Sequence, residues 1–136
     1  MSTNTTPRLR QVFYVSRSLA APGEVEHILQ SARRQNGRRG VTGSLLFTGG
    51  HFAQWLEGPA DALSDTMATI TADIRHDHVK RLIESDITQR RFSGWDMAFA
   101  EAPGVDDLIQ ELLALSEVPR ERAERVLGLM FKPPAT

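Results

Sequence analysis

A tight β-hairpin is the feature of this sequence that most constrains its fold. Two apolar runs, Ser44–Phe47 and Phe52–Leu56, flank the turn Thr48-Gly49-Gly50-His51 within residues 40–59. Glycine adopts positive φ without a steric cost, so the Gly-Gly pair favours a short turn between two antiparallel strands. The segment is therefore predicted to form a hairpin around which the other elements pack.

Side-chain alternation in the second strand of this hairpin places an amide among apolar residues. Phe52, Gln54 and Leu56 fall on one face, whereas Ala53 and Trp55 fall on the other. An amide buried without a hydrogen-bond partner costs about 1–3 kcal/mol. A polar partner for Gln54 is therefore expected on the same face of the sheet.

The composition is that of an ordinary globular protein, and it excludes several classes of function. The 136 residues suffice for one domain, with 40% hydrophobic and 24% charged residues and a formal net charge of −1. No general attraction to nucleic acid or anionic membranes follows from this charge, and no apolar run approaches the ~20 residues of a membrane span. The chain has no cysteine, which excludes disulfides and thiolate chemistry. Since the polar start has no hydrophobic signal core, the prediction is a cytoplasmic protein without nucleic-acid or membrane partners.

Hydrophobic periodicity predicts alternating strands and helices along the rest of the chain. The order β-α-β-β-α-β-β, followed by helices, is typical of an α+β ferredoxin-like sandwich with two helices on one face of the sheet. The C-terminal helices are expected to cover the other face, with a dimer interface as the alternative. In chain order, the predicted elements are strand Arg10–Ser16, helix Pro22–Gln35 stopped by Asn36-Gly37, the hairpin, helix Pro59–Arg75 ended by His76-Asp77-His78, strands Val79–Arg90 and Phe92–Ala100, and helices Val105–Leu115 and Pro119–Met130.

The histidines do not form a recognisable metal or catalytic motif. His76-x-His78 is not accompanied by a third ligand at a spacing typical of a metal site. No nucleophile elbow, paired-carboxylate pattern or zinc motif accompanies it. His27, His51 and His78 are therefore expected at the surface.

Signals for phosphate and RNA binding are also weak. Gly40-x-x-Gly43 precedes a strand and has no P-loop lysine, so its glycines are assigned to a bend and to close packing of helix and sheet. Four arginines cluster near the end of the first helix, but no aromatic residues interleave with them as a stacking platform requires. A solvated helix end is the expected role of Arg33, Arg34, Arg38 and Arg39.

A group of neutral polar residues remains to be explained. Tyr14 and Ser16 share one face of the first strand, and Asn36 follows the first helix. The first and third strands are adjacent in the centre of a ferredoxin-like sheet, so Tyr14 and Gln54 can meet at hydrogen-bond distance. These groups can satisfy one another, or they can bind the edge of a flat heterocycle sandwiched by apolar residues. The spacing alone leaves both interpretations open.

Several ungapped motifs in the same order resemble the BLUF domain, the blue-light sensor that uses flavin. The resemblance extends from about Arg10 to Ala100, roughly two thirds of the chain, and is closest to the short, stand-alone members of that family. Its matching pieces are Phe13-Tyr14-Val15-Ser16, Asn36-x-x-x-Gly40-Val41-Thr42-Gly43, Phe52-x-Gln54-x-Leu56-Glu57-Gly58-Pro59, Ile74-Arg75-His76 and Phe92-x-x-Trp95-x-Met97.

The resemblance implies a flavin, FAD in the first place with FMN or riboflavin as alternatives, held between the two helices. Tyr14 and Gln54 match the photochemical pair, and Trp95, Met97 and Ser16 are expected to modulate it. Trp55 departs from the smaller aliphatic residue that is usual there, but its side chain faces away from the flavin. Besides Tyr14 and Gln54, the residues expected to contact the flavin are Gln35, Asn36, Leu45, Phe52, Ile70, Asp73, Arg75 and His76.

The resemblance also implies the organisation and the output of the protein. Residues 1–9 are expected to form a disordered leader, residues 10–102 the flavin-binding domain and residues 103–136 a helical output or capping extension. The expected function is that of a bacterial, cytoplasmic, non-enzymatic photoreceptor in which light rearranges the Tyr14–Gln54–flavin hydrogen bonds. A downstream protein or a homo-oligomer interface would receive the signal. The alternatives are a small flavin-binding reductase and a ligand-free interaction domain.

Overall fold

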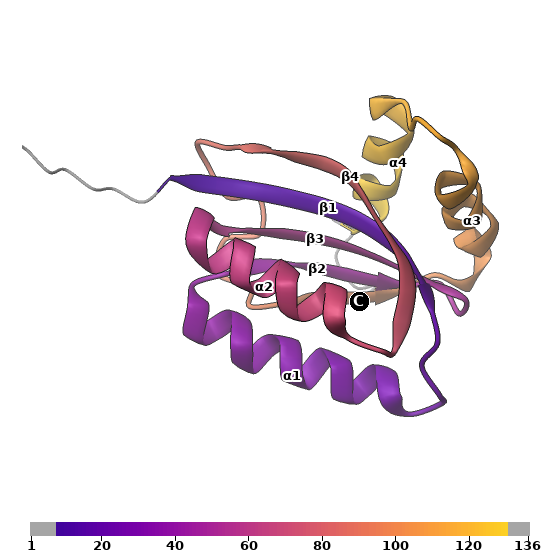
Figure 1. Ribbon diagram of the computed structural model, residues 1–136, viewed down its shortest axis with the longest axis horizontal. Coiled ribbons are helices and arrows are strands. Elements are labelled where there is room, and N and C mark those ends of the chain that lie inside the picture. The colour runs from indigo at the N-terminus through magenta and orange to yellow at the C-terminus, as the bar shows by residue number, and fades with distance from the viewer. Residues whose placement is uncertain (1–7, 131–136) are drawn as a thin grey trace, which may run out of the picture.

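The computed structural model describes residues 8–130, which form three layers (Figure 1). The elements are β1 (Leu9–Ser18), α1 (Glu24–Arg39), β2 (Thr42–Phe47), β3 (His51–Pro59), α2 (Ala60–Ala72), β4 (His76–Asp86), β5 (Ala98–Glu101), a 3-10 turn (Pro103–Val105), α3 (Asp106–Ala114) and α4 (Arg120–Met130). A five-stranded sheet of order β4-β1-β3-β2-β5 lies in the middle. Helices α1 and α2 cover one face, and α3 and α4 cover the other. The predicted ferredoxin-like sandwich is confirmed. The predicted leader lies mostly outside the described residues, and β1 begins at Leu9.

The central strands carry the residues that build the site. β1 and β3 are antiparallel, and Tyr14 lies directly opposite Gln54. The hairpin between β2 and β3 forms as expected, with Gly49 at φ 101° in its turn. Gly43 is required for this pairing, because a Cβ at that position would lie 2.1 Å from the carbonyl oxygen of Trp55. The register therefore places a tyrosine and a glutamine side by side on one face of the sheet.

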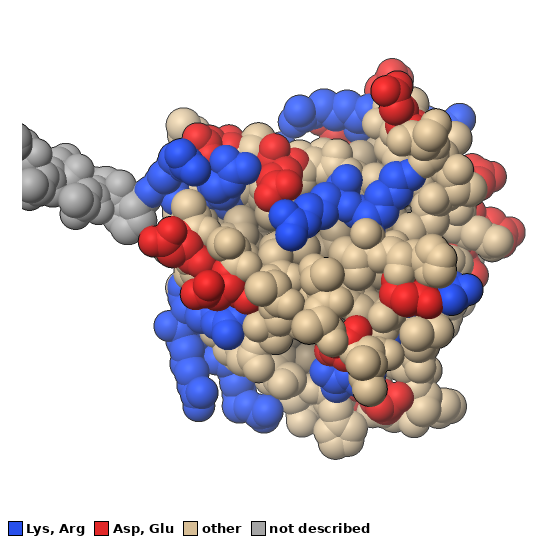
Figure 2. All heavy atoms as spheres, viewed as in Figure 1, with Lys and Arg blue, Asp and Glu red and all other residues tan. Residues whose placement is uncertain are grey.

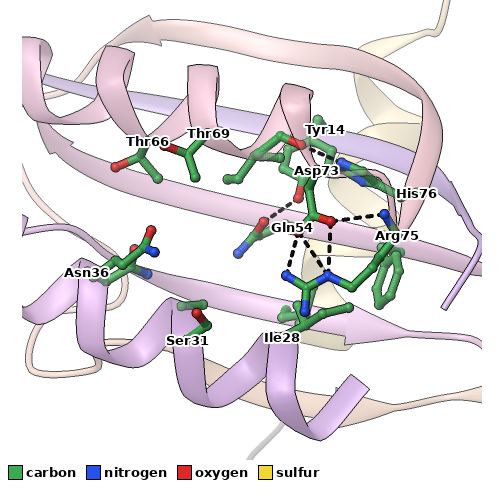
Figure 3. Close-up of a pocket in the computed structure, with 15 residues that line it drawn as sticks. Tyr14, Ile28, Ser31, Asn36, Gln54, Thr66, Thr69, Asp73, Arg75 and His76 are labelled. Atoms are coloured by element: carbon green, nitrogen blue, oxygen red, sulfur yellow. Dashed lines mark hydrogen bonds and ion pairs between the residues drawn. The ribbon is translucent and has the colours of Figure 1, made fainter. Parts of the chain in front are cut away.

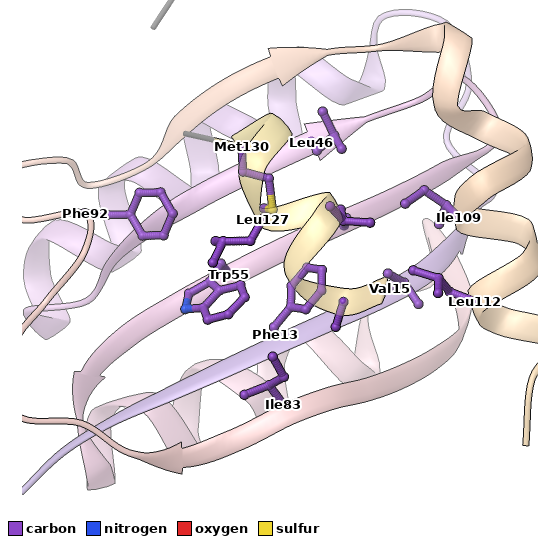
Figure 4. Packing of buried hydrophobic residues seen from close by; sticks show 13 residues of the cluster. Phe13, Val15, Leu46, Trp55, Ile83, Phe92, Ile109, Leu112, Leu127 and Met130 are labelled. Carbon is purple, nitrogen blue, oxygen red and sulfur yellow. The ribbon is translucent and has the colours of Figure 1, made fainter. Parts of the chain in front are cut away.

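Alternation along the strands divides the core into two layers. On the α1–α2 side, the buried residues include Val12, Leu45, Leu56, Leu63 and Met67. On the other side, Phe13 stacks on Trp55 at 4.8 Å between ring centroids, and residues of α3 and α4 pack over them (Figure 4). The helices that follow β5 therefore supply the second core, which includes Ile109, Leu112, Val126, Leu127 and Met130.

Both helices of the first layer end at a different place from the one predicted. The Asn36-Gly37 stop was wrong: α1 continues to Arg39 because Gly40, at φ 70°, supplies the left-handed residue that ends it. Asn36 therefore lies inside the helix and is buried. The second helix ends at Ala72 and not at the predicted Arg75, so Ile74 lies beyond it and is 88% exposed.

Two neighbouring predictions about histidines need correction. His76-Asp77-His78 does not end a helix but begins β4, which pairs with β1. His51 is not a surface residue; it is 7% exposed because its Nδ1 lies 2.9 Å from the Asp106 carboxylate at the start of α3. His27 and His78 are exposed, as expected.

The last predicted strand is much shorter than the sequence indicates. Only Ala98–Glu101 pairs, parallel to β2, and the preceding residues form a loop. In that loop, backbone groups bond mostly to side chains of β3 and α1, although the Trp95 carbonyl oxygen accepts from the Gly43 amide of β2. Trp95 and Met97 consequently do not share a face: Trp95 is 46% exposed, whereas Met97 is buried.

Candidate functional site

A cleft lies between α1, α2 and the sheet, with about 670 Å³ of empty space that includes volume open to solvent (Figure 3). All ten residues that the sequence assigned to cofactor contact line it. The lining consists of Tyr14, Ile28, Ser31, Ala32, Gln35, Asn36, Leu45, Phe52, Gln54, Thr66, Thr69, Ile70, Asp73, Arg75 and His76.

A directed chain of hydrogen bonds lies at the floor of the cleft. The Tyr14 hydroxyl donates a short hydrogen bond to Gln54 Oε1. Gln54 Nε2 in turn donates to the thioether sulfur of Met97, at 3.6 Å. Burial of the Tyr14 phenol, together with the negative charge of Asp73, raises its pKa above the ordinary value. Tyr14 therefore stays protonated throughout the physiological pH range and acts as the donor of this pair.

His76 forms one wall beside this pair, and its protonated nitrogen can be assigned from its partners. Nε2 lies 2.6 Å from the Ile70 carbonyl oxygen, which can only accept, so Nε2 carries a hydrogen. Nδ1 lies 2.8 Å from Ser16 Oγ. These two contacts fix the imidazole edge-on to Tyr14, with 6.1 Å between ring centroids. Ser16 is thus outside the cleft lining but positions a residue that belongs to it.

An ion pair marks the end of the cleft near the last turn of α2. Arg75 Nη2 donates to Asp73 Oδ2 at 2.6 Å, and the Arg75 backbone amide donates to Asp73 Oδ1 at 2.9 Å. The hydrogen bonds from Arg75 lower the pKa of Asp73, although desolvation opposes this shift. The pair provides a fixed positive and negative group at one edge of the cleft.

Asn36 occupies the opposite end of the cleft and connects α1 to the loop before β5. Its Nδ2 donates to the Asp96 carbonyl oxygen at 2.8 Å. That bond uses one of its two amide hydrogens, so Asn36 retains donor and acceptor capacity for a ligand. On the adjacent turn, Arg39 Nη1 donates to Thr66 Oγ1 at 3.2 Å and joins α1 to α2.

The sequence did not identify every lining residue. The lining residues that were not predicted are Ile28, Ser31, Ala32, Thr66 and Thr69. The signal that could have found them is helical spacing, since positions 28, 31, 32, 35 and 36 share one face of α1. Trp95 does not line the cleft.

The chemistry of the lining suits a flat heterocycle with donors and acceptors on its edge. Apolar side chains from both helices and the sheet, such as Ile28, Leu45 and Ile70, can pack on its faces. The amides of Gln54 and Asn36 can each donate and accept at its rim. A flavin ring has this character, so the residues present fit one. Among residues 8–130 there is no cluster of three or more His, Asp or Glu side chains that could hold a metal, and no helix there is long and apolar enough to cross a membrane.

Comparisons with known proteins agree with this chemistry. The family model for sensors of blue light using FAD (BLUF) matches residues 9–98. The blue light- and temperature-regulated antirepressor BluF of Escherichia coli is 34% identical over 89 residues, which cover 64% of this chain and 22% of that protein. The photoactivated adenylate cyclase subunit beta of Euglena longa is 30% identical over 96 residues, covering 65% of this chain and 11% of that protein.

Among solved structures, the dark-state structure of the BLUF protein BlrB is similar over most of both chains. It has a TM-score of 0.74 at 33% identity and covers 88% of this chain and 92% of BlrB. The chain thus spans less than a quarter of the two curated relatives named above but nearly all of BlrB. The chain belongs to the BLUF family, the sensors of blue light using FAD.

Proposed function

We propose that this protein is a blue-light photoreceptor that binds FAD in the cleft and signals by rearranging the hydrogen bonds of Tyr14 and Gln54. The observation that carries the proposal is the buried chain Tyr14–Gln54–Met97, which lies beside apolar walls suited to a flavin ring. The family description favours FAD over FMN or riboflavin. Gln35, Asn36, Leu45, Phe52, Ile70, Asp73, Arg75 and His76 are the remaining proposed contacts.

The flavin would supply absorption of blue light and an excited state that readily accepts an electron. Tyr14 is the proposed donor of that electron and then of its hydroxyl proton, since burial keeps the phenol protonated beforehand. Both the electron and the proton would return to Tyr14, so that the tyrosine ends in its original oxidation state. Its hydrogen bond to Gln54 makes the glutamine the first group to respond when the phenol changes.

Gln54 can store the response because its amide has two usable orientations. In the structure, Oε1 accepts from Tyr14 and Nε2 donates to the Met97 sulfur. Rotation of the amide exchanges these atoms, so that the NH₂ group faces the tyrosine oxygen, which can accept as well as donate. A tautomeric form of the amide would have a similar effect. The stored signal is therefore a changed hydrogen-bond pattern at the rim of the cleft and not a lasting redox change.

The output is proposed to leave through β5 and the C-terminal helices to a downstream protein or to an interface between copies of this chain. α3 and α4 form the second core directly behind β1 and β3, so a shift in the central strands reaches them. We propose that this chain acts as a sensor and not as an enzyme, because the family model that it matches describes sensors of blue light. A bacterial, cytoplasmic setting is part of the same proposal.

One spectrum separates this proposal from its alternatives. The purified protein is expected to be yellow, with a flavin absorption band that shifts slightly to the red under blue light and returns in the dark. Lasting bleaching of the band by a reduced nicotinamide would indicate a reductase instead. A protein that stays colourless after incubation with FAD would indicate a ligand-free interaction domain. Chromatography of the flavin released by heating identifies the bound form.

A further inference from the structure

A fully buried carboxylate on the far face of the sheet has no part in the proposed photochemistry. Glu57 lies on β3, three residues after Gln54, and its side chain has no solvent exposure. Burying such a group is costly unless it is well hydrogen-bonded. Glu57 Oε1 accepts from the backbone amide of Arg91 at 2.6 Å, and Oε2 accepts from the backbone amide of Phe92 at 2.9 Å. The hydroxyl of Thr42 is a third donor, at 3.3 Å.

These bonds anchor the start of a segment that passes from one face of the sheet to the other. Phe92 belongs to the core beneath α4, where Figure 4 shows it on the same side of the sheet as Trp55 and Met130. Met97 belongs to the core on the cleft side and touches Gln54. Only residues 93–96 separate the two. The segment 91–97 is thus a short connection between the Glu57 anchor and the sulfur that faces the switch glutamine.

The far end of this segment is held through successive carbonyl groups. The Trp95 carbonyl oxygen accepts from the Gly43 amide at 3.2 Å, and the Met97 carbonyl oxygen accepts from Arg33 Nε at 3.1 Å. Between them, Asp96 accepts from Asn36. At the near end, the Arg91 guanidinium lies over the Trp55 ring, 5.3 Å from its centroid. Both ends of the segment 91–97 are held, and only a few residues lie between them. A displacement of the Glu57 side chain is therefore transmitted to Met97.

We infer that Glu57 is a positioning residue for the Met97–Gln54 contact and that it sets the lifetime of the light state. This inference rests on the proposed photoreceptor function. Confinement of the Gln54 amide by the Met97 sulfur contributes to the barrier for its return to the dark orientation. Loosening the anchor lets Met97 withdraw and lowers that barrier.

Glu57→Gln is the variant that tests the anchor most selectively. Glutamine has nearly the same shape, but its NH₂ group cannot accept from a backbone amide, so one of the two anchoring bonds is lost. The measured quantity is the rate constant of dark recovery after blue light, followed at the red-shifted absorbance. We expect bound flavin and the light-induced shift to be retained. Recovery should accelerate about three- to tenfold, the range that corresponds to the loss of one hydrogen bond of ordinary strength.

A double-mutant comparison separates positioning from general loosening. In a Met97→Leu background the sulfur is absent, so Glu57→Gln should have a smaller effect on dark recovery. The change in the logarithm of the recovery rate constant should be less than about half of the change that Glu57→Gln causes in the wild-type background. Lys80→Met is the control for stability, because it removes hydrogen bonds from Lys80 to the carbonyl oxygens of Leu112 and Leu115 without touching the segment 91–97. It should leave recovery unchanged.

Three results would overturn the inference: unchanged recovery in Glu57→Gln, an equal acceleration in both Met97 backgrounds, or an equal acceleration by Lys80→Met. A wild-type protein that shows no red shift at all would instead contradict the photoreceptor proposal. The two failures are therefore distinguishable in the same set of samples.

Discussion

The attachment of α3 to the β2–β3 turn can be tested by removing one carboxylate. Asp106, the first residue of α3, accepts from Thr48 Oγ1 at 2.7 Å, from the Gly50 amide at 2.9 Å and from His51 Nδ1 at 2.9 Å. Thr48 and Gly50 belong to the turn that leads into β3, and His51 is the first residue of β3. Asp106→Ala removes the acceptor of all three at once.

The expected loss of stability follows from the burial of these groups. Thr48 and His51 are 2% and 7% exposed, so neither can turn freely to water once Asp106 is gone. The Thr48 hydroxyl keeps the His51 carbonyl oxygen as an acceptor, at 3.3 Å. His51 Nδ1 is therefore the buried donor that loses its partner, at a cost of about 1–3 kcal/mol, whereas the half-buried Gly50 amide can be solvated. Because the Asp106 side chain is itself 32% exposed, the lower part of this range applies. We expect Asp106→Ala to lower the free energy of unfolding by about 1–2 kcal/mol beyond the loss of its charge at the helix N-terminus.

Equilibrium urea unfolding, followed by circular dichroism, measures this quantity directly. Asp107→Ala is the matched control: Asp107 is also in the first turn of α3 but is exposed. Both variants lose a favourable charge at the helix N-terminus, worth about 0.3–1 kcal/mol, so their difference isolates the bonds to the turn. If Asp106→Ala and Asp107→Ala agreed within about 0.5 kcal/mol, the attachment would contribute nothing measurable and the reasoning would fail.

The structure carries three further predictions. Desolvation opposes ionisation of Asp106, but the hydrogen bonds from His51, Thr48 and Gly50 outweigh it and lower the pKa of Asp106. The contribution of the ionised Asp106 to the free energy of unfolding is therefore complete above about pH 4, and it is lost as the pH falls through the lowered pKa of the folded state. Acid unfolding of Asp106→Asn should accordingly depend less on pH below pH 4, and an unaltered profile would contradict this. Gly43→Ala should abolish soluble expression or lower the melting temperature sharply, because the new Cβ would lie 2.1 Å from the Trp55 carbonyl oxygen. Gly104→Ala is the control and should leave expression and the melting temperature unchanged, because no atom other than those of its chain neighbours lies within 4 Å of the new Cβ. Leu112→Ala should cost about 2–5 kcal/mol in urea unfolding, since Leu112 is fully buried against the sheet; a loss below 1 kcal/mol would mean that α3 does not pack there.

The central part of the fold was predictable because it depends on local alternation. The pattern around Tyr14 and around Gln54 determines which face of each strand is buried, and topology then makes the two residues neighbours. The residues of the cleft walls, by contrast, were predicted from the family resemblance and not from helical spacing. Even the unpredicted Ser31 and Thr69 lie at positions that the period of α1 and α2 brings to the cleft.

The parts of the fold that were not predicted depend on contacts between residues far apart in the sequence, which hydrophobic periodicity does not reveal. The sequence before β5 is typical of a strand through Trp95 and Met97, but most of its bonded backbone groups pair with the side chains of Glu57, Asn36 and Arg33. His51 resembles a surface turn residue until Asp106, 55 positions later, covers it. The end of α1 was misplaced because Asn36-Gly37 and Gly40 are both plausible stops, and only the backbone conformation distinguishes them.

The most direct test of the photoreceptor proposal compares the light-induced absorption shift in the wild type with that in Tyr14→Phe and Gln54→Leu. Phenylalanine removes only the hydroxyl that donates to Gln54, and leucine removes only the amide that receives it, so the apolar walls of the cleft remain. Both variants should bind flavin and remain yellow, yet show no reversible red shift under blue light. A full shift in either variant would contradict the proposed role of the Tyr14–Gln54 pair as the switch.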